Sequence, residues 1–238
     1  METSPAKDAI LRRHLGLPAE LGSAGVLPWD ALAEIAEALR VPAGGLLVDV
    51  ACGRGGYGIE LARRGNATLI GVDFSAVALK QAGRIATRRL AAGQAEFKVG
   101  TLTHMDLPTA TADAILCTDS VQFADPPIAA LSEFRRVLKP GGRLALTTWQ
   151  PTSPGDPGVV VRLRDLDLLR DLQTAGFHDV VVEDRPVWRA AERGIWEEAA
   201  ATPNDGSDLA LASLQQEGRR SLEDFDALRR VVAYATAP

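Results

Sequence analysis

Short, almost continuous apolar runs recur along the first 150 residues and alternate with segments of helical periodicity. LLVDVA, ATLIGVD and ADAILCT, at 46–51, 67–73 and 112–118, are three such runs. Apolar runs of this length are typical of strands that are buried on both faces, as in parallel sheets. Strands that alternate with helices indicate βαβ units, and right-handed crossovers place the helices on both faces of the sheet. The chain is therefore predicted to adopt an α/β, doubly wound, Rossmann-like fold.

Length and charge narrow the possible partners. The 238 residues suit one domain with a large core, or one domain with an added cap, and the net charge of -5 gives no electrostatic reason to bind nucleic acid or an anionic membrane. Cys52 and Cys117 lie within apolar runs, which favours buried reduced thiols and no metal cluster. The first ten residues are polar, and no apolar run approaches membrane-spanning length. We expect a cytoplasmic protein without nucleic-acid or membrane partners, and the oligomeric state stays open.

The stretch VDVACGRGGYG, at 48–58, contains G-x-G-x-x-G as Gly53, Gly55 and Gly58. Glycines at this spacing let backbone N–H groups approach a ligand, and the helix that follows favours negative charge at its N-terminus. Asp73, at the end of the next apolar run, has the place of a carboxylate that accepts two hydrogen bonds from ribose hydroxyls. These features fit a dinucleotide and S-adenosylmethionine equally well.

Asp49 distinguishes the two cofactors. It lies near the end of the first predicted strand, four residues before Gly53, where burying a carboxylate is costly unless the charge is paired. A pyrophosphate would add a like charge. The ammonium and sulfonium groups of S-adenosylmethionine would offset the charge of Asp49, so the sequence favours this cofactor over NAD.

Three stretches then carry a family resemblance: VDVACGRGG, GVDFSAVAL, and the segment from Ala112 to Leu144 that includes LSEFRRVLKPGGRL. From about Leu46 to Trp149, and more weakly to Val182, the chain resembles the class I S-adenosylmethionine-dependent methyltransferases, especially the small-molecule, type 11 group. The resemblance implies a seven-stranded, mostly parallel sheet with an antiparallel last strand. It also implies S-adenosyl-L-methionine as methyl donor and a small-molecule methyl acceptor.

The resemblance implies a cofactor site at the strand ends, without a metal. Its expected members are Asp49, Ala51, Gly53, Gly55, Asp73, Phe74, Ser75, Thr101, Leu102, Cys117, Thr118 and Gln122. Two positions depart from the family pattern. Ala51 replaces the first glycine, which is tolerable if its φ is negative. Thr101 and Leu102 stand where many members have an acidic residue facing the adenine amino group, so either the Thr101 hydroxyl or the Leu102 backbone would take that role.

Methyl transfer from a sulfonium needs an aligned acceptor and a water-free site rather than a nucleophile of the enzyme's own. A general base helps when the acceptor is a hydroxyl or phenol. Asp119, just past the fourth predicted strand, and His14, in the N-terminal region, are the candidate catalytic residues, with His104 a weaker one. The structural alternatives are a loop-supporting carboxylate for Asp119 and solvated imidazoles for the two histidines.

The predicted topology places the acceptor. If the sixth strand is parallel to the first five and the seventh returns antiparallel, the insertion between them begins and ends at the carboxyl edge of the sheet. We therefore expect a helical cap over a mainly apolar pocket that takes a small, partly hydrophobic acceptor. The expected cap residues are Ile195, Trp196, Leu209, Leu211 and Leu214, and for most of them the alternative is packing among the cap helices themselves.

Four segments follow from this topology. They are an N-terminal helical cap (1–40), a cofactor-binding core (41–188), a helical insertion (189–228) and the last strand (229–238). Within them we expect a plain turn at 139–142 and one helix over 162–176. The insertion is expected as three short helical pieces, the last with a capping box from Ser221 to Asp224.

Two other functions stay open at this point. An NAD(P)-dependent oxidoreductase would need a hydride-transfer site, and the chain has no Tyr-x-x-x-Lys motif. A non-catalytic protein with the same fold, acting as a regulator or assembly partner, is kept open by Ala51 and Thr101.

Overall fold

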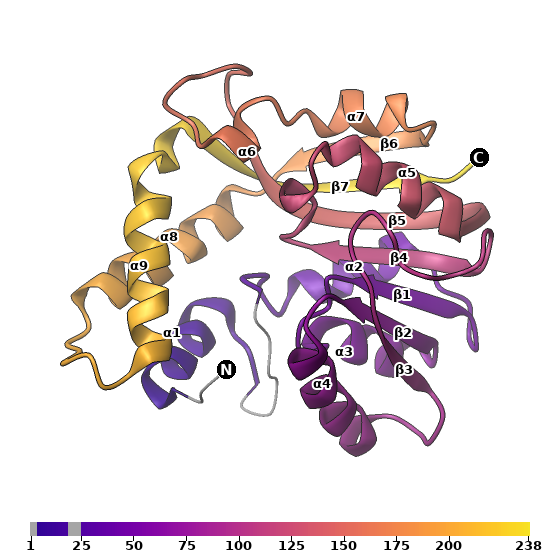
Figure 1. Ribbon diagram of the computed structural model, residues 1–238, viewed down its shortest axis with the longest axis horizontal. Coiled ribbons are helices and arrows are strands. Elements are labelled where there is room, and N and C mark those ends of the chain that lie inside the picture. The colour runs from indigo at the N-terminus through magenta and orange to yellow at the C-terminus, as the bar shows by residue number, and fades with distance from the viewer. Residues whose placement is uncertain (1–3, 19–24) are drawn as a thin grey trace.

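A seven-stranded sheet of order β3-β2-β1-β4-β5-β7-β6 runs through the computed structural model, which describes residues 4–18 and 25–238 (Figure 1). Neighbouring strands among β1 to β5 pair in parallel, whereas β7 is antiparallel to both β5 and β6. The predicted doubly wound α/β class and the antiparallel last strand are confirmed. The strands are β1 (Leu46–Val50), β2 (Thr68–Asp73), β3 (Ala95–Val99), β4 (Ala112–Thr118), β5 (Leu138–Pro151), β6 (His178–Asp184) and β7 (Leu228–Thr236).

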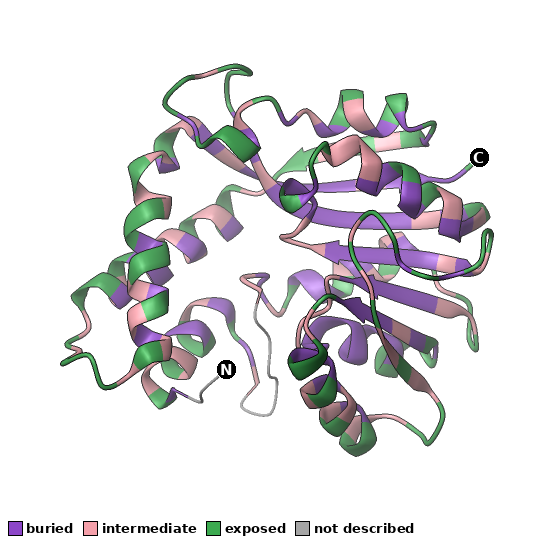
Figure 2. Cartoon of the chain, viewed as in Figure 1, coloured by how far each residue is buried: buried purple, intermediate pink, exposed green. Residues whose placement is uncertain are grey.

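Helices cover both faces of the sheet, and the central strands are buried between them (Figure 2). Alternate residues of one strand enter different cores: Leu47 packs with α2 and α3, and Val48 packs with α5 and α7. None of the described helices is long and apolar enough to cross a membrane. The helices are α1 (Pro5–Leu15), α2 (Ala31–Leu39), α3 (Gly56–Gly65), α4 (Ala76–Arg89), α5 (Pro127–Val137), α6 (Val161–Arg164), α7 (Leu168–Thr174), α8 (Pro186–Ala201) and α9 (Leu209–Glu223), with 3-10 turns at Val121–Phe123 and Phe225–Ala227.

Two local predictions in the second half of the sheet are wrong. The stretch 139–142 is a bulged part of β5 rather than a separate turn, because the pairing with β4 jumps from Ala112↔Leu138 to Ala114↔Arg143. The helix predicted over 162–176 is two helices, α6 and α7. Asp167 begins the second of them by accepting a hydrogen bond from the Arg170 N–H at 3.1 Å.

The segment between β6 and β7 folds into α8 and α9, and α1 packs against both (Figure 1). The Ser4 hydroxyl donates to Asp208 Oδ2 at 2.5 Å, so the start of α1 is tied to the start of α9. We call α1, α8 and α9 the cap. The α2 helix, predicted to belong with α1, instead buries Leu32 and Ile35 in the core between the sheet and α3.

The insertion also differs from its predicted boundaries. The α8 helix begins at Pro186, three residues before the boundary expected at 189. The capping box predicted at Ser221 to Asp224 is wrong, because α9 continues through Ser221 to Glu223. The α9 helix is capped at its other end by Asp208, which accepts a hydrogen bond from the Leu211 N–H at 2.9 Å.

Glu60 fixes the helix that follows the glycine loop. Its carboxylate is buried on α3 and accepts hydrogen bonds from Arg63, Arg64 and Arg89, at 2.6 to 3.0 Å. These guanidinium groups, Arg63 first, lower the pKa of Glu60 to about 2. Because Arg89 lies on α4, the cluster joins α3 to α4.

Glu60→Gln is expected to lower the free energy of unfolding by about 2–4 kcal/mol, because three arginines lose a buried carboxylate. The ionised carboxylate stabilises the fold above its ordinary pKa of 4.5, and this contribution is lost as the pH falls toward about 2. Urea denaturation at pH 7 and pH 3 measures both effects. Glu96→Gln, at an exposed pair with Lys98, is the control and should change stability by less than about 0.5 kcal/mol. Equal effects of the two substitutions would contradict the role of Glu60.

Candidate functional site

A cavity of about 1030 Å³ lies at the carboxyl ends of β1 and β4 and is closed on one side by the cap. Its volume is at the upper end of the range for small-molecule sites. The core contributes residues of the glycine loop, Tyr57, and the segment after β4. The remaining walls come from Gly25 and Val26, Trp149, residues 157–164, Glu192 and Trp196 of α8, and the inner side of α9.

The glycine loop is shaped by close approaches of the backbone. Gly53 and Gly55 have φ values of 54° and 75°, in the left-handed region that favours glycine. A Cβ atom on Gly58 would lie 2.4 Å from Asp49 Oδ2, so only glycine lets α3 begin beside that carboxylate. The Gly53 N–H donates to Asp73 Oδ2 at 2.8 Å, which joins the loop to the end of β2.

Ala51 also has a positive φ, 56°. Alanine was expected to be tolerated here only if its φ was negative, and this condition is not met. A side chain with a Cβ atom is held here in a conformation that costs roughly 1–2 kcal/mol relative to glycine.

Asp49 is buried, and within the described residues it accepts a hydrogen bond from the Gly58 N–H at 3.2 Å. Burial raises the pKa of Asp49 to about 7, the Gly58 N–H lowers it, and the negative charge of Asp73 raises it further. No cation is among the groups that set this pKa. The carboxylate therefore fits a ligand that carries positive charge, as the ammonium and sulfonium of S-adenosylmethionine do.

The adenosine side was expected at Asp73 to Ser75 and at Thr101 and Leu102. Asp73 accepts the Ser75 N–H at 2.8 Å, and the Ser75 hydroxyl caps α4. Phe74 is 79% exposed at the same strand end. Thr101 is exposed on a short bridge with His104, and Leu102 packs partly against the core. The described lining of the cavity includes none of these residues, because they lie at the β2 and β3 ends, beyond the loop.

Of the other expected cofactor residues, Asp49, Ala51, Gly53, Thr118 and Gln122 line the cavity. Gly55 is buried under the loop, and Cys117 is fully buried in the core.

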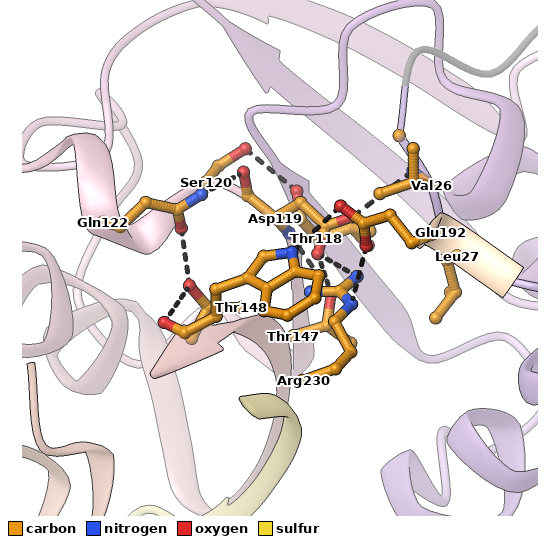
Figure 3. A network of polar contacts seen from close by, with 12 residues as sticks. Val26, Leu27, Thr118, Asp119, Ser120, Gln122, Thr147, Thr148, Glu192 and Arg230 are labelled. Carbon is orange, nitrogen blue, oxygen red and sulfur yellow. Dashed lines mark hydrogen bonds and ion pairs between the residues drawn. The ribbon is translucent and has the colours of Figure 1, made fainter. Parts of the chain in front are cut away.

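A buried charge cluster was missed by the sequence analysis (Figure 3). Arg230 of β7 is fully buried, and its guanidinium contacts Asp119 Oδ1 and lies 3.3 Å from Glu192 Oε2. The Trp149 indole N–H donates to Glu192 Oε1 at 2.9 Å, and the Thr147 hydroxyl donates to Asp119 Oδ1 at 2.7 Å. The one available signal was an arginine pair inside the apolar strand LRRVVAYAT.

Glu192 is buried on α8 and lines the cavity. Burial raises the pKa of its carboxyl to about 8, while the charge of Arg230 lowers it and that of Asp119 raises it. A pKa near neutrality is typical of groups that exchange protons at functional sites.

Tyr57 and Asp119 hold a strap, residues 25–27, against the cavity. The Tyr57 hydroxyl accepts the Leu27 N–H at 3.0 Å and lies 2.9 Å from the Leu27 carbonyl and 3.0 Å from the Gly25 carbonyl. Asp119 Oδ2 accepts the Val26 N–H at 3.3 Å. Both oxygens of Asp119 are therefore engaged, by the strap on one side and by Arg230 and Thr147 on the other.

The two histidines considered as general bases lie in different parts of the structure. His14 lies on α1 with Nε2 2.7 Å from Glu198 Oε2 of α8, and it is not among the described residues that line the cavity. His104 is exposed and is also absent from the described cavity lining.

Gln122 lines the cavity. Its amide N–H donates to the Asp119 carbonyl at 2.8 Å, and its amide oxygen accepts from the Thr148 hydroxyl at 2.8 Å.

The cap wall is more polar than expected. Trp196 lines the cavity, but Ile195, Leu211 and Leu214 are buried within the cap and Leu209 is exposed. The α9 helix faces the cavity with Ser213, Gln216, Glu217, Arg220 and Ser221. The expectation of a mainly apolar pocket is therefore wrong for this wall, because the apolar stripe of α9 packs inward on α8.

Ala51→Gly is expected to raise the melting temperature by about 1–3 °C, since glycine removes the left-handed strain at a net gain of about 0.5–1 kcal/mol. Ala190→Gly, at an exposed position inside α8, is the matched control and should lower stability by about 0.5–1 kcal/mol. Calorimetry on both variants gives the comparison. A decrease for Ala51→Gly similar to that of the control would contradict the backbone conformation at this residue.

Comparisons with known proteins agree with this geometry. The sequence profile of a family described as "Methyltransferase domain" matches residues 48–146. The chain is 32% identical over 162 residues to phosphoethanolamine N-methyltransferase of Triticum aestivum, covering 64% of this chain and 32% of that protein. It is 36% identical over 121 residues to demethylmenaquinone methyltransferase of Deinococcus radiodurans, covering 49% of this chain and 48% of that protein. The chain thus spans between a third and a half of the length of these relatives.

The fold recurs in solved structures. The [4+2]-cyclase SpnF superposes with a TM-score of 0.79 at 23% identity, over 98% of this chain and 93% of that one. A geranyl diphosphate methyltransferase in complex with S-adenosylmethionine gives a TM-score of 0.70 at 18% identity, over 100% and 93% of the two chains. The matched domain spans the glycine loop, Asp73 and the segment after β4. Residues 48–146 therefore form a domain of the methyltransferase family, and the whole chain shares its fold with a solved methyltransferase.

Proposed function

We propose that the protein transfers a methyl group from S-adenosyl-L-methionine to a small organic acceptor by direct displacement. One observation carries the proposal: a single cavity is lined both by the glycine loop and by Glu192 and Trp196 of the cap. A donor on the loop and an acceptor under the cap would share one enclosed space, which favours alignment and excludes water. The names of the relatives, which include methyltransferases of phosphoethanolamine and demethylmenaquinone, support a small acceptor.

The core residues would hold the cofactor. Asp73 is proposed to bind the ribose hydroxyls, with Phe74, Ser75, Thr101 and Leu102 around the adenosine. Asp49, the backbone of Ala51 and Gly53, Thr118 and Gln122 are proposed at the methionine end, and Gly55 and Cys117 support the loop and the β4 end from beneath. When bound, S-adenosyl-L-methionine supplies a methyl group already activated by the sulfonium.

The other residues position the acceptor. We propose that Asp119 is a positioning residue that acts through Arg230 and the strap, since both its oxygens are engaged. His14 is proposed as part of the cap, through its contact with Glu198, rather than as a base. The division into cap and cofactor-binding core is likewise proposed.

A cytoplasmic location is also proposed. Cys52 and Cys117 are free thiols, as is usual in a reducing compartment.

Asp73→Asn is expected to weaken binding of S-adenosylmethionine at least tenfold, because an amide replaces a carboxylate in two charge-assisted hydrogen bonds to the ribose. Isothermal titration calorimetry measures the affinity. Asp113→Asn is the control, since this carboxylate pairs with Lys139 and the Leu46 N–H at the opposite end of the strands. Unchanged affinity in a folded Asp73→Asn protein would remove Asp73 from the ribose site.

Ser213→Trp should fill the cap side of the cavity, leaving binding of S-adenosylmethionine within a few-fold while abolishing methyl transfer. Ser207→Trp, exposed in the loop between α8 and α9, should leave both unchanged. The measurements are calorimetry with S-adenosylmethionine and release of S-adenosylhomocysteine with a panel of small acceptors. Loss of cofactor binding along with turnover in the Ser213 variant would mean that the cap side is not the acceptor site.

A further inference from the structure

The buried part of the cavity holds more negative than positive charge. Among the described residues, Asp49, Asp119 and Glu192 place carboxylates in its inner wall, and Arg230 is the guanidinium buried behind them. The positive groups of the cofactor would compensate the charge of Asp49. Two carboxyl groups then remain around one guanidinium, so the acceptor side carries one negative charge when both carboxyl groups are ionised.

The arginines at the mouth do not offset this charge. Arg164 donates to the carbonyls of Pro157 and Val159, at 3.1 Å each. Arg162 is exposed and lies over the Phe123 ring, 5.3 Å from its centroid. Arg220 is exposed on α9. Arg164 is thus engaged by backbone carbonyls, and the charges of Arg162 and Arg220 are screened by solvent.

Glu192 also has unused hydrogen-bonding capacity. It is 3% exposed, and its Oε2 has no hydrogen-bond partner within the described part of the chain, although Arg230 Nε lies 3.3 Å away. Its other oxygen is held by Trp149. Because buried carboxylate oxygens normally accept a hydrogen bond, the unsatisfied Oε2 indicates a donor that a ligand would supply. Trp149 and Trp196 line the same cavity and offer aromatic surface to a cation.

Resting on the methyl-transfer function proposed above, we propose that the acceptor is an amine, bound as its ammonium against Glu192 beside Trp149 and Trp196, and methylated on nitrogen. Charge development in the reaction favours this acceptor over a hydroxyl. An amine nitrogen becomes positive as the methyl group arrives, so it needs no cation beside it, and Glu192 can take its proton beforehand. A hydroxyl would pass through a negative oxygen and need a cation, yet Arg230 is buried and engaged by two carboxylates.

The step balances with the residues present. The bound ammonium gives one proton to the Glu192 carboxylate, which frees the nitrogen lone pair. The lone pair forms the N–C bond to the methyl carbon as the C–S bond breaks, and that electron pair leaves on sulfur as S-adenosylhomocysteine. The product is the N-methylated ammonium, and Glu192 returns its proton to solvent.

This placement predicts proton release. The pKa of Glu192, about 8, is set by burial, by Arg230 on β7, Asp119 after β4 and Glu217 on α9, and by the Trp149 N–H. A bound ammonium stabilises the ionised carboxylate, so at pH 7 Glu192 must lose a proton when the amine binds. Amine affinity should therefore rise between pH 6 and pH 8, while the affinity of a neutral alcohol should not.

The test uses protein loaded with S-adenosylhomocysteine and arylalkylamines from benzylamine to 4-phenylbutylamine, each matched with the alcohol and the carboxylate of equal chain length. Calorimetry at pH 7 in two buffers of different ionisation enthalpy gives affinity and proton release together. We expect at least one amine to bind ten times more tightly than its alcohol and carboxylate, with a proton released. Equal or tighter binding of the alcohols or carboxylates overturns the proposal, and so does binding of none of the amines.

Glu192→Gln keeps an acceptor for Trp149 but removes the charge, so it should lose the amine preference and the proton release while keeping S-adenosylhomocysteine affinity within threefold. Glu197→Gln, exposed on the same helix, is the matched control. Retained amine preference in folded Glu192→Gln overturns the proposal, and the wild-type proton release tests it even if this variant does not fold.

Mass spectrometry of products formed with S-adenosylmethionine separates the two levels of inference. Methylation of alcohols or carbon atoms alone overturns the amine assignment and leaves the methyl-transfer function standing. Failure to bind S-adenosylmethionine or S-adenosylhomocysteine overturns the function itself.

Discussion

The buried guanidinium of Arg230 fixes how the cap and the sheet meet. A cation without solvent requires carboxylates, and here they come from two separate places, Asp119 at the end of β4 and Glu192 on α8. Arg230 itself belongs to β7, so one side chain joins the last strand, a central strand and the cap. The orientation of Trp149 and the strap then follows, because Trp149 donates to Glu192 and the Val26 N–H of the strap donates to Asp119. The site is organised by this charge cluster as much as by its apolar packing.

The glycine loop is limited by a different constraint, namely how little space is left beside the Asp49 carboxylate. Gly58 lets α3 start against the carboxylate, and the helix is then fastened on its far side through Glu60. A costly buried charge and a strained backbone at Ala51 persist because the surrounding strands and helices hold them. The backbone strain at Ala51 and the desolvated carboxylate of Asp49 therefore lie close together. A positively charged ligand there would offset the desolvation of Asp49.

The sheet could be predicted because each buried strand is a short apolar run, and local pattern alone identifies such runs. The bulge in β5 could not, since pairing with Ala112 and Ala114 sets it rather than the sequence 139–142. The position of α2 against the sheet and α3 also could not be predicted, because it depends on which apolar surface of the folded core other helices leave uncovered. Glu192 has the appearance of a solvated residue on an amphipathic helix, and its burial depends on Arg230, far along the chain. The contact of His14 with Glu198 could not be predicted for the same reason, because the packing of α1 on α8 sets it.

The attachment of α1 to α8 and α9 unites two distant parts of the chain in one cap. The Ser4 and His14 contacts fasten the α1 region to α9 and α8, while the Tyr57 hydroxyl bonds to the strap, which comes after α1 in the chain. Tyr57 itself comes directly after the glycine loop. It is the second residue of α3, so the hydrogen bonds of the strap reach the first turn of this helix. The cap on one side of the cavity and α3 on the other are therefore both fastened to residues that precede α2 in the chain.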